Sequence, residues 1–289
     1  MTKILLLGSN GQLGSLLTQL FLQLSNFNIS NPSSSECDLS NENSIINYLY
    51  NKKFDILINC AAFTNVDLAE EKVKLSNKIN SLSLKFLCDN LNQDCSILHI
   101  STDYVFDGNN NVPYIETDFC RPLSQYGKSK HEGEKILNLY NRRILVVRTA
   151  GLYSYKGHNF LTKIVSKIKN NENISVIKNQ YTSTTSALDL SNFIYQIIVS
   201  KKIYSLEEKL NIFHYVNDGN ISWFEFAEEI CKIYEYKKKI EALDYSKYKF
   251  IAKRPKYSVL NNSKLKNYFN VSINNFNNSL KNCIYKFEK

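Results

Sequence analysis

A tyrosine and a lysine four positions apart are the residues of this sequence best suited to acid–base chemistry. If Tyr126-Gly127-Lys128-Ser129-Lys130 is helical, the side chains of Tyr126 and Lys130 share one face. A lysine ammonium beside a phenol would lower the phenol pKa from about 10, so Tyr126 could act as a general acid near neutral pH. Four other pairs have this spacing, so context must separate them: Tyr48/Lys52, Tyr234/Lys238, Tyr245/Lys249 and Tyr285/Lys289.

The segment before Tyr126 supplies that context. Ser101 and Thr102 close a short apolar run, and ligands of parallel sheets bind outside the carboxyl ends of the strands. A hydroxyl at such an end can hydrogen bond to a substrate carbonyl. Because neighbouring strand residues face opposite sides, at most one of the two hydroxyls faces the cleft. A solvent-exposed turn held by the same hydroxyls is the structural alternative.

A glycine-rich loop near the N-terminus indicates a nucleotide site. Gly8, Gly11 and Gly14 lie between an apolar run and an amphipathic segment. We expect Gly8 to permit a tight turn, Gly11 to let backbone N–H groups approach a pyrophosphate, and Gly14 to let strand and helix pack closely. A plain glycine-rich turn is the alternative. The spacing Gly-x-x-Gly-x-x-Gly resembles that of extended short-chain dehydrogenases/reductases.

The elements that would position these residues follow from hydrophobic periodicity. Continuous apolar runs fit strands buried on both faces, and the segments between them carry apolar residues at helical spacing. This alternation predicts an α/β fold with a doubly wound parallel sheet. The predicted strands lie near residues 3–7, 55–59, 96–100 and 144–147, and the first two helices near residues 13–24 and 79–91.

Beyond the fourth strand the rhythm changes, which predicts a smaller substrate-binding lobe. We expect helices near residues 159–169 and 222–234, the second opened by Ser222 and Glu225 as a capping box. The Rossmann domain would comprise residues 1–148 and about 186–218, and the lobe about 149–185 and 219–289.

Composition narrows the function classes. The 289 residues are 43% hydrophobic and 22% charged, which is ordinary for a globular protein. No apolar run approaches the roughly 20 residues that span a bilayer, so we expect a cytoplasmic protein without a membrane partner. The net charge of +9 comes from dispersed lysines, which favours a solvated surface over a nucleic-acid site. The seven cysteines lack a Cys-x-x-Cys pair and fit free thiols better than disulfides or zinc ligands.

These motifs resemble the dTDP-4-dehydrorhamnose reductase family of extended short-chain dehydrogenases/reductases, and the resemblance covers nearly the whole chain in order. The string Ser-Thr-Asp-Tyr-Val-Phe is its most specific part. The matching segments are residues 8–14, 60–70, 101–108, 126–130, 148–149, 157–160, 179–180, 214–227 and 254–260.

The resemblance implies roles for individual residues. Thr102, Tyr126 and Lys130 would be catalytic: Tyr126 would donate the proton, Lys130 would hold the nicotinamide ribose, and Thr102 would hydrogen bond to the carbonyl oxygen. The cofactor would be NADPH or NADH, with no arginine before Arg121 to reveal the preference. Its binding residues would be Gly8, Gly11, Gln12, Leu13, Gly14, Asp38, Leu39, Ala61, Ala62, Phe63, Ile100, Tyr126 and Lys130. Substrate would be bound by Thr64, Val66, Thr102, Asp103 and Gly151.

The implied reaction is reduction of the C4 keto group of a nucleotide-linked 4-keto-6-deoxyhexose, such as dTDP-4-dehydrorhamnose to dTDP-L-rhamnose for surface polysaccharide. No metal site is predicted, and His99, His131 and His158 are assigned structural or surface roles. The oligomeric state stays open, with a homodimer as one option.

Departures from the family pattern concentrate on the substrate side. Gly151 stands where the family usually has tryptophan, and Thr182 and Thr184 replace glycine and proline. A reductase or epimerase/reductase for another nucleotide sugar is therefore an alternative. A non-catalytic subunit resembling the regulatory β subunit of methionine adenosyltransferase is another, although the complete set of Thr102, Tyr126 and Lys130 disfavours it.

Overall fold

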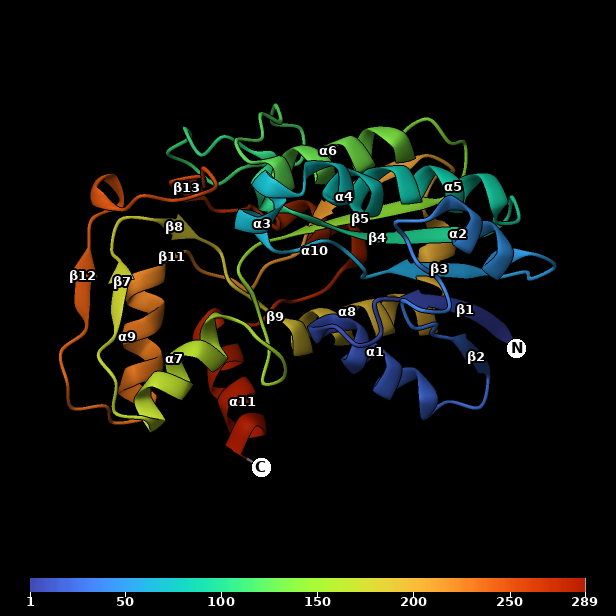
Figure 1. Cartoon of the computed structure of the whole chain (residues 1–289). Helices are drawn as coiled ribbons and strands as arrows, with labels where there is room; N and C mark the ends of the chain where they lie inside the picture. The colour runs from blue at the N-terminus through green and yellow to red at the C-terminus, as the bar shows by residue number, and fades with distance from the viewer. Residues whose placement is uncertain (289) are drawn as a thin grey trace.

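A parallel six-stranded sheet forms the centre of the larger part of the molecule (Figure 1). The computed structural model describes residues 1–288. The strand order β10-β5-β4-β3-β1-β2 reverses direction at β1, the position at which doubly wound sheets bind ligands. The predicted doubly wound parallel sheet is confirmed. Its strands are β1 (Thr2–Leu7), β2 (Phe27–Ser30), β3 (Ile56–Asn59), β4 (Ser96–Thr102), β5 (Ile144–Thr149) and β10 (Leu210–His214).

Two of these strands, β2 and β10, were not predicted. They occupy the two edges of the sheet, and several of their residues are only half-buried. An edge strand therefore lacks the continuous apolar run that marked the four central strands. The four predicted strands coincide with β1, β3, β4 and β5.

Helices cover both faces of this sheet. Along β1, Ile4 and Leu6 pack into the core beneath α1 and α8, whereas Leu5 and Leu7 pack into the core beneath α2 and α5. This period of two is what a strand buried on both faces requires. In Figure 1, α1 and α8 lie on one side of the sheet and α2, α5 and α6 on the other. These helices are α1 (Gln12–Leu22), α2 (Glu42–Leu49), α5 (Ser83–Asn90), α6 (Gln125–Leu137) and α8 (Ala187–Val199).

The link from β3 to β4 is a nearly continuous helical segment that contains one π-helical turn. It runs through α3 (Val66–Glu71), α4 (Val73–Asn77) and the turn η1 (Lys78–Leu82) into α5. The helix predicted near residues 79–91 is this last part. π-helical turns are rare and often lie at functional sites, and this one carries Asn80 toward the loop after β3.

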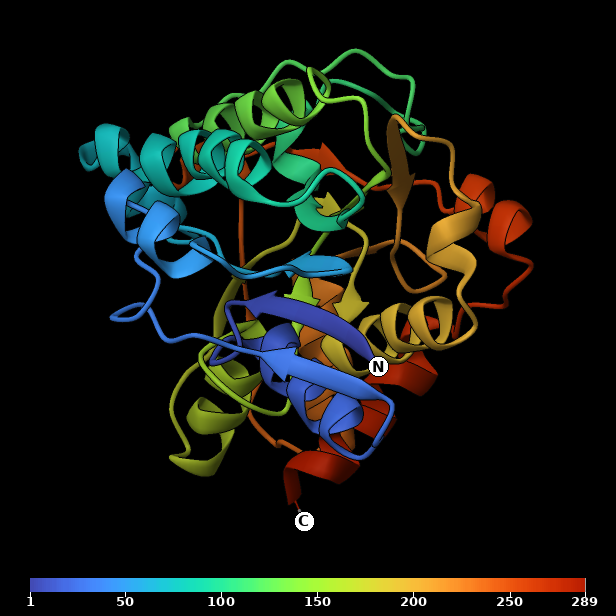
Figure 2. The ribbon, with the colours of Figure 1, turned by 90° about the vertical axis from the view of Figure 1, so that its right-hand side faces the viewer.

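The smaller part of the molecule has its own hydrophobic core, in which Tyr153, Phe226 and Leu280 are fully buried. The red C-terminal helix of this part lies at the bottom of the view in Figure 2. The predicted capping box is confirmed: the Ser222 hydroxyl accepts from the Glu225 N–H, and the Glu225 carboxylate accepts from the Ser222 N–H. Its helices are α7 (Phe160–Lys169), α9 (Trp223–Ile233) and α11 (Phe276–Glu288), and its strands are β6 (Leu152–Tyr153), β7 (Ser175–Ile177), β8 (Tyr181–Thr182), β9 (Thr185–Ser186), β11 (Ile221–Ser222), β12 (Glu241–Leu243) and β13 (Tyr257–Ser258).

From the lobe the chain returns to the sheet through α8 and β10, which lie within residues 186–218 of the proposed division. One later helix departs from that division. In α10 (Ser263–Phe269), Leu265 and Phe269 pack into the core of the larger part, although sequence analysis placed this segment in the lobe. Across residues 1–288, no helix combines the length and the apolar character that crossing a bilayer would need.

Candidate active site

The glycine loop has the backbone geometry that its spacing predicts. Gly8 adopts a φ of +81°, and a Cβ there would lie 2.6 Å from the Ala61 nitrogen. A Cβ on Gly14 would lie 2.2 Å from the Gly8 carbonyl oxygen, so strand and helix could not pack as they do. Gly11 is the N-cap of α1 and has no side chain to cap the first N–H groups of the helix. The first N–H groups of α1 are therefore available to an anion.

Gln12 and Leu13 follow in the first turn of that helix. The Leu13 side chain is buried in the core, so only its N–H can serve a ligand. The buried Gln12 Oε1 has no hydrogen-bond partner within the described residues. A buried, unpartnered polar atom beside a glycine cradle fits a site that takes a polar, anionic cofactor.

Asp38 and Leu39 lie on the loop between β2 and α2. The Asp38 carboxylate accepts hydrogen bonds from the Ser40 N–H (2.8 Å) and hydroxyl (3.0 Å), which closes its own turn. Leu39 is buried in the core above the sheet. Their predicted position by the adenine stays a prediction.

Two buried asparagines fix the loop after β3, which carries the predicted cofactor residues Ala61, Ala62 and Phe63. Asn59 Oδ1 accepts from the Ala61 N–H at 3.1 Å. Asn80 accepts from the Phe63 N–H at 2.7 Å and donates to the Phe63 carbonyl at 3.1 Å. Sequence analysis missed both. A polar residue that ends an otherwise apolar strand, as Asn59 does, is the signal that could have found the first.

A buried series of hydrogen bonds, through Asn59 and His99, connects this loop to Lys130. Lys130 Nζ donates to the Ile100 carbonyl at 2.6 Å and lies 3.1 Å from His99 Nε2. His99 Nδ1 in turn lies 3.2 Å from Asn59 Nδ2. His99, assigned a structural or surface role from the sequence, is buried and directly contacts the predicted catalytic lysine.

The charge state of Lys130 follows from these contacts. Burial lowers the pKa of Lys130 to about 8, with Glu134 and Cys60 opposing the shift. The hydrogen bonds of His99 and Asn59 also favour a lowered pKa of Lys130. Asn59 Nδ2 can only donate, so His99 Nδ1 must accept and His99 Nε2 must carry the proton. An uncharged lysine accepts that proton, whereas an ammonium group cannot.

Thr102 and Tyr126 meet at the carboxyl end of β4. The Thr102 hydroxyl accepts from the Tyr104 N–H at 3.2 Å and also hydrogen bonds to Tyr126. Tyr126 lies in the first turn of α6, where the capping hydroxyl of Ser124 accepts from the Gly127 N–H. The Tyr104 and Tyr126 rings pack edge to face, 5.8 Å apart.

The predicted lowering of the Tyr126 pKa is wrong for this structure. Burial raises the pKa of Tyr126 to about 12, although the hydrogen bond from Thr102 partly offsets it. Lys130 Nζ is directed at Ile100 and His99, and Lys130 is not among the groups that shift the pKa of Tyr126. Tyr126 is therefore fully protonated at neutral pH.

Ser101 and Asp103, on either side of Thr102, both point into the protein. The Ser101 hydroxyl donates to Glu134 at 2.6 Å, so of this pair Thr102 alone faces Tyr126. Asp103 accepts from Thr102 at 3.0 Å and hydrogen bonds to Ser258, and burial raises the pKa of Asp103 to about 6. Asp103, predicted to bind substrate, is thus buried and hydrogen bonds to the Thr102 hydroxyl.

A cavity of about 770 Å³ opens beside Tyr104, between the loop after β3 and the lobe. The predicted substrate residues Thr64 and Val66 line it. Arg254 and Asp67 form an ion pair of 2.7 Å that joins the lobe to α3 across its wall. Asp67 is the one acidic residue in the described lining, against four cations, so the cavity suits an anionic ligand. Those cations are Lys163, Lys167, Lys249 and Arg254.

Gly151 has a backbone reason to be glycine. Its φ is +52°, and a Cβ would lie 2.6 Å from the Ser183 carbonyl oxygen. The Trp223 ring lies 3.5 Å from the same point and packs on Phe160 with ring centroids 4.6 Å apart. Since Trp223 and Phe160 both line the cavity, α9 and α7 supply the aromatic wall beside Gly151.

Comparison with known proteins identifies the family. The family described as RmlD substrate binding domain matches residues 1–289. The chain belongs to this family. A curated RmlD-family relative, dTDP-4-dehydrorhamnose reductase of Aggregatibacter actinomycetemcomitans, is 31% identical over 98% of each chain.

Solved structures of RmlD-family enzymes have the same fold. A dTDP-4-dehydrorhamnose reductase from Clostridium acetobutylicum is 33% identical, covers 100% of both chains and superposes with a TM-score of 0.90. The enzyme from Bacillus anthracis, in complex with NADP, is 28% identical over 99% of this chain and 100% of its own, with a TM-score of 0.87. The resemblance seen in the sequence motifs is thereby confirmed.

Proposed function

We propose that this protein reduces the C4 keto group of a nucleotide-linked 4-keto-6-deoxyhexose, with dTDP-4-dehydrorhamnose as substrate and dTDP-L-rhamnose as product. One observation carries the proposal: a protonated tyrosine and a threonine hydroxyl meet at the carboxyl end of β4, beside a cavity with a cationic wall. The names of the relatives support the substrate. The proposed role of the product is in surface polysaccharide.

The proposed cofactor is NADPH, which the NADP complex of the Bacillus anthracis relative supports, with NADH as the alternative. The N–H groups of Gln12 and Leu13 would hold its pyrophosphate at the start of α1, beside Gly11, whose own N–H donates to the Gly8 carbonyl at 2.9 Å. Lys130, with Ile100 at its side, would bind the nicotinamide ribose. When bound, the cofactor supplies the hydride.

The protein's own task is to hold the carbonyl and deliver a proton. The Tyr126 hydroxyl would donate to the C4 carbonyl oxygen, and Thr102 would turn its one proton from Asp103 to the same oxygen when substrate binds, which places the developing negative charge between two donors. An alkoxide is a stronger base than a phenolate, so Tyr126 can release its proton to the product oxygen even with its pKa raised to about 12. In this structure Asp103 accepts the Thr102 proton at 3.0 Å.

The residues that line the cavity would bind the diphosphate, the base and the sugar of the substrate. A sugar nucleotide carries a diphosphate, and Lys163, Lys167 and Arg254 would balance its charge. Aromatic rings stack on bases and on the apolar faces of sugars, a role that Trp223 and Phe160 can fill. The free thiols of the described chain fit a reducing compartment, which supports the proposed cytoplasmic location.

A substrate panel tests this proposal. Oxidation of NADPH and of NADH is followed with dTDP-, UDP-, GDP- and CDP-linked 4-keto-6-deoxy sugars, and we expect the highest kcat/KM with dTDP-4-dehydrorhamnose. A higher value for another nucleotide sugar would support the alternative that Gly151, Thr182 and Thr184 raised. Cofactor binding without turnover of any sugar would favour a non-catalytic subunit.

Gly11→Val tests the cofactor site separately. A Cβ at Gly11 meets only the Gly8 oxygen, at 3.2 Å, whereas one at Gly8 or Gly14 would collide with backbone. The variant should therefore fold and yet block a phosphate. We expect fluorescence of bound NADPH to be lost while the thermal unfolding midpoint changes little. Unchanged NADPH affinity in the folded variant would refute the assignment.

A further inference from the structure

A second cavity lies on the opposite face of α6 from Tyr126. It has a volume of about 910 Å³ and shares no lining residue with the substrate cavity among the described residues. The loop of residues 117–123 forms one wall, and Lys128, His131 and Lys135 of α6 form the other. The mechanism proposed above uses none of these side chains.

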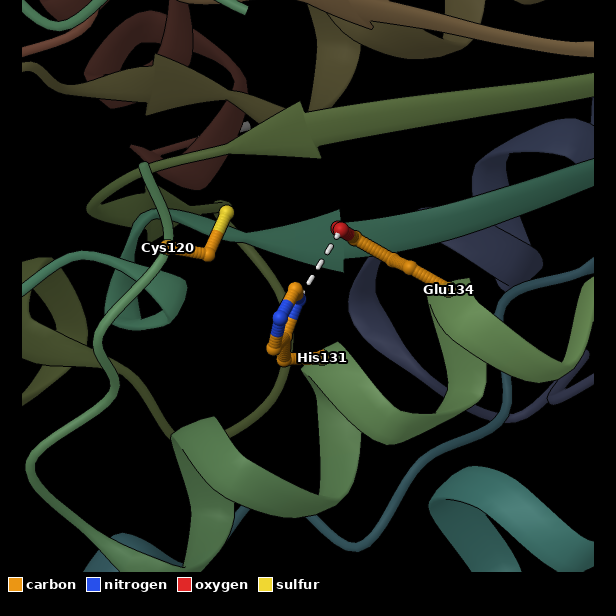
Figure 3. A group of neighbouring side chains, drawn as sticks. All are labelled: Cys120, His131 and Glu134. Atoms are coloured by element: carbon orange, nitrogen blue, oxygen red, sulfur yellow. Dashed lines mark ion pairs between the residues drawn. The ribbon is translucent and has the colours of Figure 1, made fainter. Parts of the chain in front are cut away.

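Three side chains with different metal-binding atoms converge at the inner end of this cavity (Figure 3). One ligand atom each from Cys120, His131 and Glu134 lie within 4.8 Å of one another. His131 and Glu134 are three residues apart on α6, and Cys120 reaches them from the facing loop. A thiolate, an imidazole and a carboxylate are the three ligand types that proteins use for Zn²⁺.

The distances are close to those of a zinc site. Zinc bonds of about 2.0–2.3 Å at tetrahedral angles separate the ligand atoms by roughly 3.3–3.8 Å. His131 Nδ1 and Glu134 Oε2 are already 3.6 Å apart. The Cys120 sulfur, which lies within 4.8 Å of both other atoms, has to approach by at most about 1 Å. It can do so because it is half-buried in a loop that faces open space.

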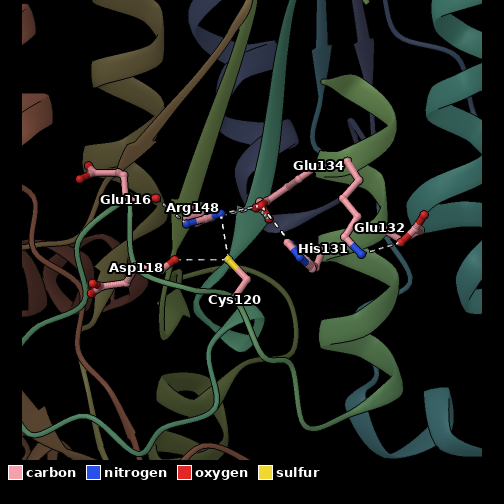
Figure 4. Close-up of polar contacts among 9 residues, drawn as sticks. Glu116, Asp118, Cys120, His131, Glu132, Glu134 and Arg148 are labelled. Atoms are coloured by element: carbon pink, nitrogen blue, oxygen red, sulfur yellow. Dashed lines mark hydrogen bonds and ion pairs between the residues drawn. The ribbon is translucent and has the colours of Figure 1, made fainter. Parts of the chain in front are cut away.

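Glu134 and His131 each keep one atom that could bind a metal ion. Glu134 Oε1 accepts from Ser101 and from Arg148 Nε, and Oε2 accepts from Arg148 Nη2 at 2.7 Å, so a lone pair of Oε2 remains (Figure 4). His131 Nδ1 lies 3.6 Å from Glu134 Oε2 and within 4.8 Å of the Cys120 sulfur. A cation between these atoms could bind the spare Oε2 lone pair and the ring nitrogen together.

Arg148 does not exclude a cation from this cluster. Its Nη2 donates to Cys120 Sγ at 3.3 Å and to Glu134 Oε2 at 2.7 Å, so it holds both ligand groups on the same side of the cluster. Zn²⁺ binds a thiolate and a neutral imidazole, so any protons on these two groups leave as the ion binds, which limits the positive charge added beside the guanidinium.

The geometry points to a site for one Zn²⁺ ion, held by Cys120, His131 and Glu134, with a fourth position open to water from the second cavity. Arg148 and Ser101 orient the Glu134 carboxylate. Because α6 also carries Tyr126 and Lys130, the ion would fasten the facing loop to the back of the helix that supplies these two residues.

The experiment titrates the chelator-treated full-length protein with Zn²⁺ by calorimetry and with Co²⁺ by absorption spectroscopy. We expect one equivalent of Zn²⁺ to bind and Co²⁺ to give a thiolate-to-metal charge-transfer band. Cys120→Ser and His131→Gln should each weaken Zn²⁺ binding at least tenfold, and Cys120→Ser should also remove that band. Cys60→Ser, which alters the other half-buried thiol, should bind both metals as the unmodified chain does. Circular dichroism verifies that each variant is folded.

A second measurement follows the Cys120 thiol directly. Alkylation of each cysteine by iodoacetamide is quantified by mass spectrometry with and without Zn²⁺, and the ion should slow labelling of Cys120 alone. Three results would overturn the site: no Zn²⁺ bound, binding that survives both variants, or Cys120 labelling that Zn²⁺ does not change. The last result would leave Cys120 as a thiol paired with Arg148 only.

Discussion

Two parts of the candidate site are built in different ways: the sheet wall, which carries the predicted catalytic residues behind Tyr104, and the lobe wall, which lines the substrate cavity. On the sheet side, Lys130, His99 and Asn59 form an unbroken buried hydrogen-bond chain to the cofactor loop. On the lobe side, Trp223 and Lys163 present a ring and a long flexible cation to the cavity. A hydrogen-bonded chain fixes atomic positions, whereas rings and lysines adapt to different ligands. The sheet wall therefore suits the chemistry, and the lobe wall suits the choice of sugar.

The largest effect should come from removing the proton donor of the sheet wall. Tyr126→Phe keeps the ring, which packs on Tyr104, and removes only the hydroxyl. General acid catalysis typically contributes about 10²- to 10⁴-fold, so kcat should fall by that order with cofactor affinity nearly unchanged.

Tyr234→Phe is the matched control for this prediction. Tyr234 also precedes a lysine by four positions, but its hydroxyl donates to Glu288 in the lobe. Its kcat should stay within about twofold of the unmodified enzyme, because a lost surface hydrogen bond does not touch the reaction. Full turnover by Tyr126→Phe would remove the central assignment.

The pH profile should report Lys130. A lysine whose pKa is lowered to about 8 is charged below that pH and loses its proton above it, whereas Tyr126 stays protonated up to about 12. If the ammonium binds the ribose, kcat/KM for NADPH falls about tenfold per pH unit above pH 8. The measurement is kcat/KM for NADPH from pH 6 to 10. A flat profile through pH 9.5 would contradict it.

His99→Gln should shift the fall of kcat/KM above pH 8, here called the alkaline limb, to higher pH. Glutamine offers a carbonyl oxygen that accepts from an ammonium group, so the charged form of Lys130 gains a partner and the limb shifts above pH 8. A lost buried hydrogen bond to Asn59 should also lower kcat/KM roughly tenfold.

His214→Gln is the control, since His214 is equally buried but packs on Phe106. It should leave the limb in place. A limb that does not move in His99→Gln would show that His99 only packs against Lys130.

The smallest effect concerns the lobe wall. Gly151→Ala forces a Cβ onto a left-handed residue and against the Ser183 carbonyl, which should destabilise the fold by about 1–3 kcal/mol. Because Trp223 lies beside it, KM for the sugar should rise a few-fold while KM for NADPH does not change. Gly219→Ala, also left-handed but packed on Phe276, should lower stability without a change in KM. Calorimetry and steady-state kinetics measure both effects.

The parts of the site that local sequence determines were predictable. Helical spacing placed Tyr126 and Lys130 on α6, and glycine spacing placed Gly8 and Gly14 where a Cβ does not fit. Continuous apolar runs predicted the four central strands, because a strand that is buried on both faces is apolar at nearly every position. The edge strands β2 and β10 were missed since only part of each is buried.

Tertiary structure alone decided what the side chains contact. Lys130 was expected to act on Tyr126, four residues away, yet its partner is His99, 31 positions earlier on β4. The meeting of Cys120 with His131 and Glu134 likewise depends on how a loop crosses α6. Sequence spacing determines which residues share a helix face. The direction of a flexible lysine or of a thiol on a loop depends instead on which nearby buried polar atoms need a hydrogen bond.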